Sequence, residues 1–172
     1  MPLRDIVQFP DPRLKQVSKP ITEVDDALRE LARDMIEVMY DEPGIGLAAP
    51  QVAASVRMFV IDTEWSQEGG EKQPLVVLNP EISDREGEIT WEEGCLSVPD
   101  YTANVERDAK ITLRGTDLDG NPIEETAEGL RAVCIQHEVD HLDGILFIDR
   151  ISRLKRSLYV KKRKKQLLEE QD

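Results

Sequence analysis

Apolar side chains recur on one face of a helix between residues 25 and 40. They fall three and four residues apart, which places side chains on one side of a helix with about 3.6 residues per turn. Thr22 and Asp25 can each cap its first turn. We therefore expect a first helix over 25–40, with an inner face made of Leu28, Leu31, Met35, Val38 and Met39.

Strand patterns dominate the middle of the chain, where β-branched and apolar residues gather between turn signals. We expect strands at 57–62, at 74–82, around 88–98 and within 110–126. The Asp119-Gly120 pair is typical of a hairpin turn. Residues 62–73 are acidic and contain two glycines, so we expect a surface loop there.

A second helix is expected over 127–142, ending before Gly144. No internal repeat and no linker divides the chain. The predicted fold is α+β, with antiparallel β-sheets around this central helix and a further helix at the C-terminus. Residues 1–152 would form a single catalytic domain, and 153–172 a basic C-terminal helix or tail within the same domain.

Length and composition agree with one globular domain. A chain of 172 residues can bury roughly 70% of the surface that it exposes when unfolded. Two cysteines are too few for a disulfide framework, and no segment approaches the run of about 18 apolar residues that a membrane span needs. The first residues lack the apolar stretch of a signal peptide. We expect a cytoplasmic protein without a membrane partner.

The two histidines of the chain, His137 and His141, lie in the pentapeptide HEVDH. On a helix they point from one face, one turn apart, which suits two ligands of one metal ion. Glu138 would then act as general base toward a water molecule that the metal activates, as in the H-E-x-x-H pattern. The alternative is an ordinary amphipathic helix with two unrelated histidines.

A catalytic metal site of this kind needs a third protein ligand. Phe147 stands where the three-histidine protease pattern requires its last ligand, which excludes that pattern. Cys134 lies seven residues before His141, a rise of about 10.5 Å along a helix, which is too long for bonds to one ion. Cys95 can present a thiolate from a strand end across a cleft. A carboxylate ligand stays open, and either cysteine could be a buried apolar residue.

The segment 42–52, EPGIGLAAPQV, contains small residues whose side chains leave the backbone uncovered. Gly44 and Gly46, followed by two alanines, permit another molecule to approach the peptide groups closely. The segment lacks the glycine spacing of phosphate-binding loops. It is either a binding segment or a tight connection from helix to strand.

Three segments together resemble the signature motifs of bacterial peptide deformylases. They are GIGLAAPQ at 44–51, EGCLS at 93–97 and QHEVDH at 136–141, in the order of that family. The likeness runs from FPDPRL near the N-terminus to GILFIDRIS, nearly the whole chain. It implies a metal-dependent hydrolase that removes the N-terminal formyl group from formyl-methionine of newly made polypeptides and releases formate.

The resemblance also implies roles for individual residues. They are metal ligation by Cys95, His137 and His141, proton transfer by Glu138, oxyanion binding by the side-chain amide of Gln51 and the backbone N–H of Leu96, and substrate binding by Gly44, Ile45 and Gly46 as in an added β-strand. The metal is expected to be Fe2+, with Zn2+, Ni2+ or Co2+ as alternatives.

Two other functions remain open at this point. One is a metal-dependent peptidase of the H-E-x-x-H type, with a carboxylate as third ligand, which would keep its metal after Cys95→Ser. The other is a non-catalytic ribosome-binding or metal-storage module with a closed four-ligand site. The sequence offers no obvious fourth protein ligand, which disfavours the second of these.

Charge is distributed unevenly along the chain. Residues 153–172 contain eight Lys or Arg and three Asp or Glu, a net charge of +5, whereas residues 1–152 carry −18. Because the family acts on nascent chains, we hypothesise that the basic run Arg153 to Lys165 is helical and contacts ribosomal RNA. The alternative is a solvated terminal helix. We expect a monomer.

Overall fold

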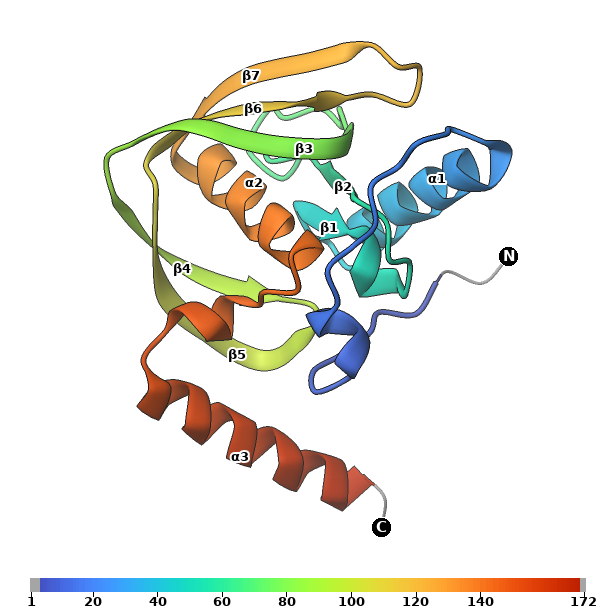
Figure 1. Ribbon diagram of the computed structural model, residues 1–172. Helices are drawn as coiled ribbons and strands as arrows, with labels where there is room; N and C mark the ends of the chain where they lie inside the picture. The colour runs from blue at the N-terminus through green and yellow to red at the C-terminus, as the bar shows by residue number, and fades with distance from the viewer. Residues whose placement is uncertain (1–3, 171–172) are drawn as a thin grey trace.

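The computed structural model describes residues 4–170 (Figure 1). Its helices and strands, in chain order, are η1 (Pro12–Lys15), α1 (Asp26–Asp41), β1 (Gly46–Ala48), η2 (Ala49–Val52), β2 (Met58–Ile61), β3 (Leu75–Glu86), β4 (Ile89–Cys95), β5 (Val98–Arg107), β6 (Lys110–Thr116), β7 (Pro122–Glu128), α2 (Gly129–Leu142), η3 (Phe147–Arg150) and α3 (Arg153–Glu170). The strands form two antiparallel sheets, ordered β1-β2-β3-β6-β7 and β4-β5. Helix α2 lies between them, which confirms the predicted α+β fold (Figure 1).

The first helix follows the apolar pattern closely. Asp25 caps α1 by accepting a hydrogen bond from the backbone N–H of Leu28 at 2.8 Å. The predicted inner face is buried, and it packs in one core cluster with β1 and β2. The end of α1 delivers the chain to Gly44, whose N–H bonds to the Met39 carbonyl at 2.7 Å.

The predicted strand segments all contain strands, and the hairpin turn between β6 and β7 passes through Gly120 at φ 81°. Strand β5 is not among the predictions. Its signal is the alternation of Tyr101, Ala103 and Val105 with exposed polar residues. A charged residue, Arg107, ends this strand at a buried position, where apolar patterning gives no indication of a strand.

Helix α2 is buried on most of its surface. Ala132, Ile135 and Leu142 pack in the core cluster formed with the five-stranded sheet. The helix begins at Gly129, two residues later than predicted, because residues 127 and 128 still pair with β6 as part of β7.

Helix α3 confirms the predicted C-terminal helix, although residues 171–172 of the predicted segment lie outside the described part of the chain. This helix contacts the rest of the protein through two buried residues, Tyr159 and Arg163. The Tyr159 ring stacks on Tyr101 of β5 at 4.8 Å, and the Arg163 guanidinium donates to the carbonyl of Phe9 at 2.9 Å. Over residues 4–170, no helix combines the length and the apolar character that crossing a membrane requires.

Candidate metal centre and active site

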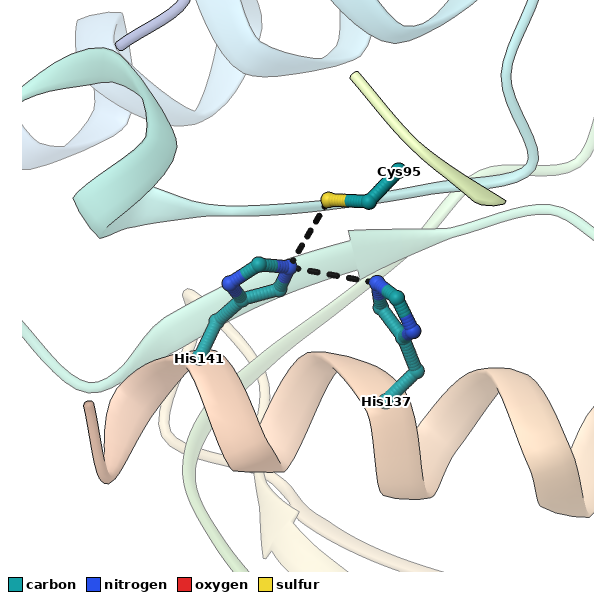
Figure 2. Close-up of side chains that lie close together, drawn as sticks. All are labelled: Cys95, His137 and His141. Carbon is teal, nitrogen blue, oxygen red and sulfur yellow. Dashed lines mark hydrogen bonds between the residues drawn. The ribbon is translucent and has the colours of Figure 1, made fainter. Parts of the chain in front are cut away.

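Cys95 lies at the end of β4, and His137 and His141 project toward it from α2 (Figure 2). Nε2 of His141 lies 3.3 Å from the Cys95 Sγ atom and 3.2 Å from Nε2 of His137. The three potential ligand atoms all lie within 4.8 Å of one another. The fold thus brings together, from two distant segments, the three residues that the family resemblance implies as ligands.

This donor set fits one divalent transition metal. Ligand atoms held at about 2.0–2.3 Å in a tetrahedron lie about 3.4 Å apart, close to the shorter separations observed. Burial lowers the pKa of His141 well below its usual value and keeps the imidazole neutral, as ligation requires. Within residues 4–170, no fourth Cys, His, Asp or Glu joins the group, so a position would remain for water or substrate.

The second cysteine, Cys134, does not belong to this group. Its side chain is buried, and its Sγ atom contacts the carbonyl oxygen of Ile45 at 3.7 Å. Burial raises the pKa of the Cys134 thiol, which therefore stays protonated. It behaves as a small apolar residue of the core.

A buried network of charged side chains contacts His137 at its Nδ1 atom. Oε1 of Glu93 lies 2.8 Å from Nδ1 of His137, and Arg107 donates two hydrogen bonds of 2.8 Å to the Glu93 carboxylate. Arg107 also bonds to Asp140, which pairs with Arg150. Sequence reasoning missed Glu93 and Arg107. The signal for Glu93 was its place in the EGCLS motif, and Arg107 gave none that a local pattern could reveal.

Glu138 is buried, with only 4% of the residue exposed. Its Oε1 has no hydrogen-bond partner among the described residues. Burial raises the pKa of Glu138 to about 7. A Cβ atom on Gly46 would lie 2.5 Å from the other carboxylate oxygen, Oε2, so the missing side chain of Gly46 makes room for this group.

Gln51 and Leu96, the two residues expected to bind the oxyanion, both lie next to Cys95. Oε1 of Gln51 accepts a hydrogen bond from the Ala48 N–H at 3.0 Å, while Nε2 lies 3.5 Å from the Cys95 sulfur and 3.1 Å from Ser97 Oγ. Leu96 follows Cys95 directly in the turn from β4 to β5. Both residues line the cleft that the cysteine faces.

This cleft has a volume of about 620 Å³, and its lining includes Gly44, Ile45, Gly46, Gln51, Cys95, Leu96 and His137. Strand β1 is an edge strand of the five-stranded sheet, so one of its edges pairs with no other described strand. A smaller pocket of about 140 Å³ adjoins His137, and its apolar lining includes Ile45, Trp91, Leu130, Val133 and Cys134.

A cysteine and two histidines beside a buried carboxylate, at the base of a cleft bordered by an edge strand, define a metal-dependent hydrolase. The sequence profile of the family described as polypeptide deformylase matches residues 3–157. A peptide deformylase of Rhodopseudomonas palustris (strain BisB5) is 53% identical over 163 residues, 94% of this chain and 93% of the relative.

Solved structures agree with this match. The crystal structure of a peptide deformylase from Legionella pneumophila has a TM-score of 0.89 and 44% identity, covering 99% of both chains. A peptide deformylase of Acinetobacter baumannii with Met-Ala-Ser bound has a TM-score of 0.81 and 33% identity, covering 87% of this chain and 99% of that one.

The chain belongs to the polypeptide deformylase family. It is an enzyme that removes the formyl group from polypeptides, and the family is one of metalloenzymes. The resemblance drawn from the three motifs is therefore confirmed. Neither the H-E-x-x-H peptidase nor the non-catalytic module is supported by these comparisons.

Proposed function

We propose that the cleft binds the N-formylmethionine end of a newly made polypeptide and that Glu138 serves as the proton carrier of its hydrolysis. The observation that carries this assignment is the unpartnered, buried oxygen of Glu138 beside the Cys95, His137 and His141 cluster. An unpaired buried carboxylate oxygen is costly for folding alone, which indicates a functional role.

Each residue of the site has its own role in the reaction. A divalent ion held by Cys95, His137 and His141 would supply a Lewis acid for the formyl carbonyl and for water. Glu138 accepts the proton of the attacking water, since its raised pKa of about 7 suits proton exchange near neutral pH. It then returns this proton to the departing amine, and formate leaves. The Gln51 amide and the Leu96 N–H donate to the formyl oxygen as negative charge develops on it.

The substrate backbone would extend the five-stranded sheet at β1. Gly44, Ile45 and Gly46 border the cleft. The N–H and the carbonyl of Gly44 already bond to Met39 and Trp65, so an extended peptide would pair with the free edge of the strand that follows. The methionine side chain, unbranched and apolar, suits the 140 Å³ pocket beside His137. The relative crystallised with Met-Ala-Ser supports a peptide of this kind.

The test is formate release from formyl-Met-Ala-Ser by protein prepared without oxygen and supplied with iron(II). The parent should release formate, and Glu138→Gln should lose activity by about 10²-fold or more. Glu30→Gln, an exposed acid on α1, is the matched control and should retain activity. A folded, metal-loaded parent that releases no formate would reject the proposal.

For the metal we propose Fe2+, with Zn2+, Ni2+ and Co2+ as alternatives, because mixed sulfur and nitrogen donors suit all of them. Metal analysis of protein purified under nitrogen, together with the activity before and after exposure to air, separates iron from zinc. An iron-free, fully active and air-stable preparation would exclude Fe2+.

We also infer that α3 contacts ribosomal RNA through its exposed basic face. Lys161, Lys162, Lys164 and Lys165 lie there, next to Leu158 and Leu168. Arg163, within the predicted Arg153 to Lys165 run, is buried and faces the body instead. This docking supports the interpretation of 153–172 as part of the same domain as 1–152. A cytoplasmic location fits a thiolate ligand, which reducing conditions preserve, and we propose that the protein is a monomer.

Ribosome co-sedimentation tests the contact. Replacing the four lysines by glutamate should abolish it, and salt should weaken it steeply in the parent. Charge substitutions are preferable to deleting α3, since a deletion would also expose the partners of Tyr159 and Arg163. Co-sedimentation that is unaffected by the four substitutions would contradict the hypothesis.

A further inference from the structure

A short N-terminal segment connects the two parts of the chain that carry the proposed oxyanion donors. The N–H of Val7 donates to the Gln51 carbonyl at 2.7 Å, and the N–H of Phe9 donates to the Ser97 carbonyl at 2.7 Å. Ser97 directly follows Leu96 in the turn from β4 to β5. The backbone of η2 and the backbone of this turn are therefore bonded to the same segment.

The side chains of Ser97 and Gln51, both buried, join these two parts a second time. Oε1 of Gln51 accepts from the Ala48 N–H, so Nε2 is the donor end of the amide. Nε2 donates one hydrogen to Ser97 Oγ at 3.1 Å and lies 3.5 Å from the Cys95 sulfur. Its other hydrogen can therefore reach a formyl oxygen beside Cys95. A displacement of Ser97 would turn this donor away from the place where negative charge develops.

Helix α3 holds the N-terminal segment through the guanidinium of Arg163. Its Nε atom donates to the Phe9 carbonyl at 2.9 Å, and Nη2 donates to Gln8 Oε1 at 3.2 Å. Tyr159 lies one turn earlier on the same face of α3, with its ring 5.9 Å from the Phe9 ring and 4.8 Å from the Tyr101 ring. Tyr101 lines the substrate cleft. Phe9 thus links α3 to the turn beside the cleft.

Arg163 contributes less to folding than its contacts suggest. Only 6% of the residue is exposed, and it forms no salt bridge with any residue between positions 4 and 170. Taking a cation out of water is costly when no anion compensates for its hydration. What the guanidinium provides is geometry, because its donors lie in one rigid plane and hold two acceptors in a fixed relation.

We propose that Arg163 is a positioning residue for deformylation. It acts through Phe9 and Ser97 on the Gln51 amide, and the inference rests on the proposed role of that amide as an oxyanion donor. Removing such a donor typically lowers kcat by about 10²- to 10³-fold. Loss of Arg163 keeps the donor but misplaces it, so kcat should fall by about tenfold. KM should change little, because the donor acts on charge that develops only in the transition state.

The experiment measures kcat and KM for formyl-Met-Ala-Ser with metal-loaded parent, Arg163→Met, Gln51→Ala and the double variant. Arg163→Met should lower kcat about tenfold in the parent but less than about twofold in Gln51→Ala, where the donor that it positions is absent. Arg163→Lys keeps one donor for the Phe9 carbonyl and should recover part of the loss. If Arg163→Met does not fold, Arg163→Lys carries the same test with a smaller loss. Arg33→Met, the same substitution at an exposed position of α1, is the matched control and should retain kcat.

Different results would overturn different parts of the proposal. A parental kcat in folded, metal-loaded Arg163→Met would show that α3 does not position the donor, and it would leave deformylation intact. Equal losses in the parent and in Gln51→Ala would assign the effect to a general loosening of the fold. A parental kcat in Gln51→Ala would reject the oxyanion role on which the inference rests. A parent that releases no formate would instead reject the proposed function itself.

Discussion

The carboxylate of Glu93 holds the imidazole of His137 in one tautomer, through a contact of 2.8 Å to Nδ1. Burial alone would raise the pKa of Glu93, but hydrogen bonds from Arg107 and His137 hold it at about 2. The ionised carboxylate can only accept, so Nδ1 carries the hydrogen. The other ring nitrogen, Nε2, is the atom that lies beside His141 in the proposed metal site.

Glu93→Gln should weaken metal binding by about 10- to 100-fold, because the amide is a poorer acceptor for the His137 hydrogen and removes one of the two carboxylates that pair with Arg107. The measurement is metal retention against a competing chelator. Glu92→Gln, a neighbouring exposed acid of β4, is the matched control and should retain metal like the parent. Equal retention by both variants would argue against a supporting role for Glu93.

Gly46→Ala should reduce activity more than stability. The added Cβ would lie 2.5 Å from Glu138 Oε2 and 2.9 Å from Cys134 Sγ, so it displaces the proposed proton carrier. Gly115→Ala is the opposite case, because its Cβ would lie 2.7 Å from Val77 Cγ1 and 2.8 Å from the Leu78 carbonyl. It should lower the melting temperature while folded protein keeps its kcat. Thermal unfolding and kinetics of both variants test this contrast.

Trp65 ties the acidic loop 62–73 to the substrate cleft. Its indole N–H donates to the Gly44 carbonyl at 3.1 Å, and its ring packs edge-on against Tyr40 at 5.1 Å. Trp65→Phe keeps an aromatic ring and loses the donor, so we expect KM to rise about two- to tenfold with little change in kcat. Ser66→Ala, at an exposed neighbouring position, should leave both constants unchanged. A Trp65→Phe enzyme with parental KM would refute the positioning role.

Acid should weaken the anchoring of the same loop at Asp62. Burial alone would raise the pKa of this carboxyl, but hydrogen bonds from Tyr40 and the N–H groups of Gln73, Glu64 and Trp65 lower it below 3.8. A lowered pKa contributes stability above about pH 3.8, which is lost as the pH falls through the folded-state value. The stability difference between parent and Asp62→Asn should be largest near neutral pH and shrink on acidification. Denaturant unfolding at several pH values would measure it, and a constant difference would contradict this account.

Removing the metal should abolish formate release and lower stability together. A ligand that binds only the folded state adds about 2.7 kcal/mol when present at a hundred times its Kd. Chelation should therefore reduce the melting temperature, and added iron(II) or zinc should restore it. In Cys95→Ser, which replaces the thiolate, metal addition should raise the melting temperature much less. A full thermal shift in that variant would place the third ligand elsewhere.

The sequence alone determined the features that depend on local periodicity. The inner face of α1 and the turn at Gly120 follow from side-chain spacing and backbone freedom, and the structure contains both. The sequence offered Thr22 and Asp25 as caps of α1, and the structure uses Asp25. The pairing of His137 with His141 also follows from helix geometry, since residues four apart share a face. The resemblance of three motifs supplied the family.

Only the tertiary structure decided which segments meet. Local spacing could not choose between a cysteine and a carboxylate as third ligand, and it was the packing of β4 against α2 that set Cys95 beside His141. The Glu93–Arg107 pair and the contact of Trp65 with Gly44 likewise join residues far apart in the chain. Such contacts depend on how sheets and helices pack around a shared core, and no periodic pattern within a single segment records that arrangement.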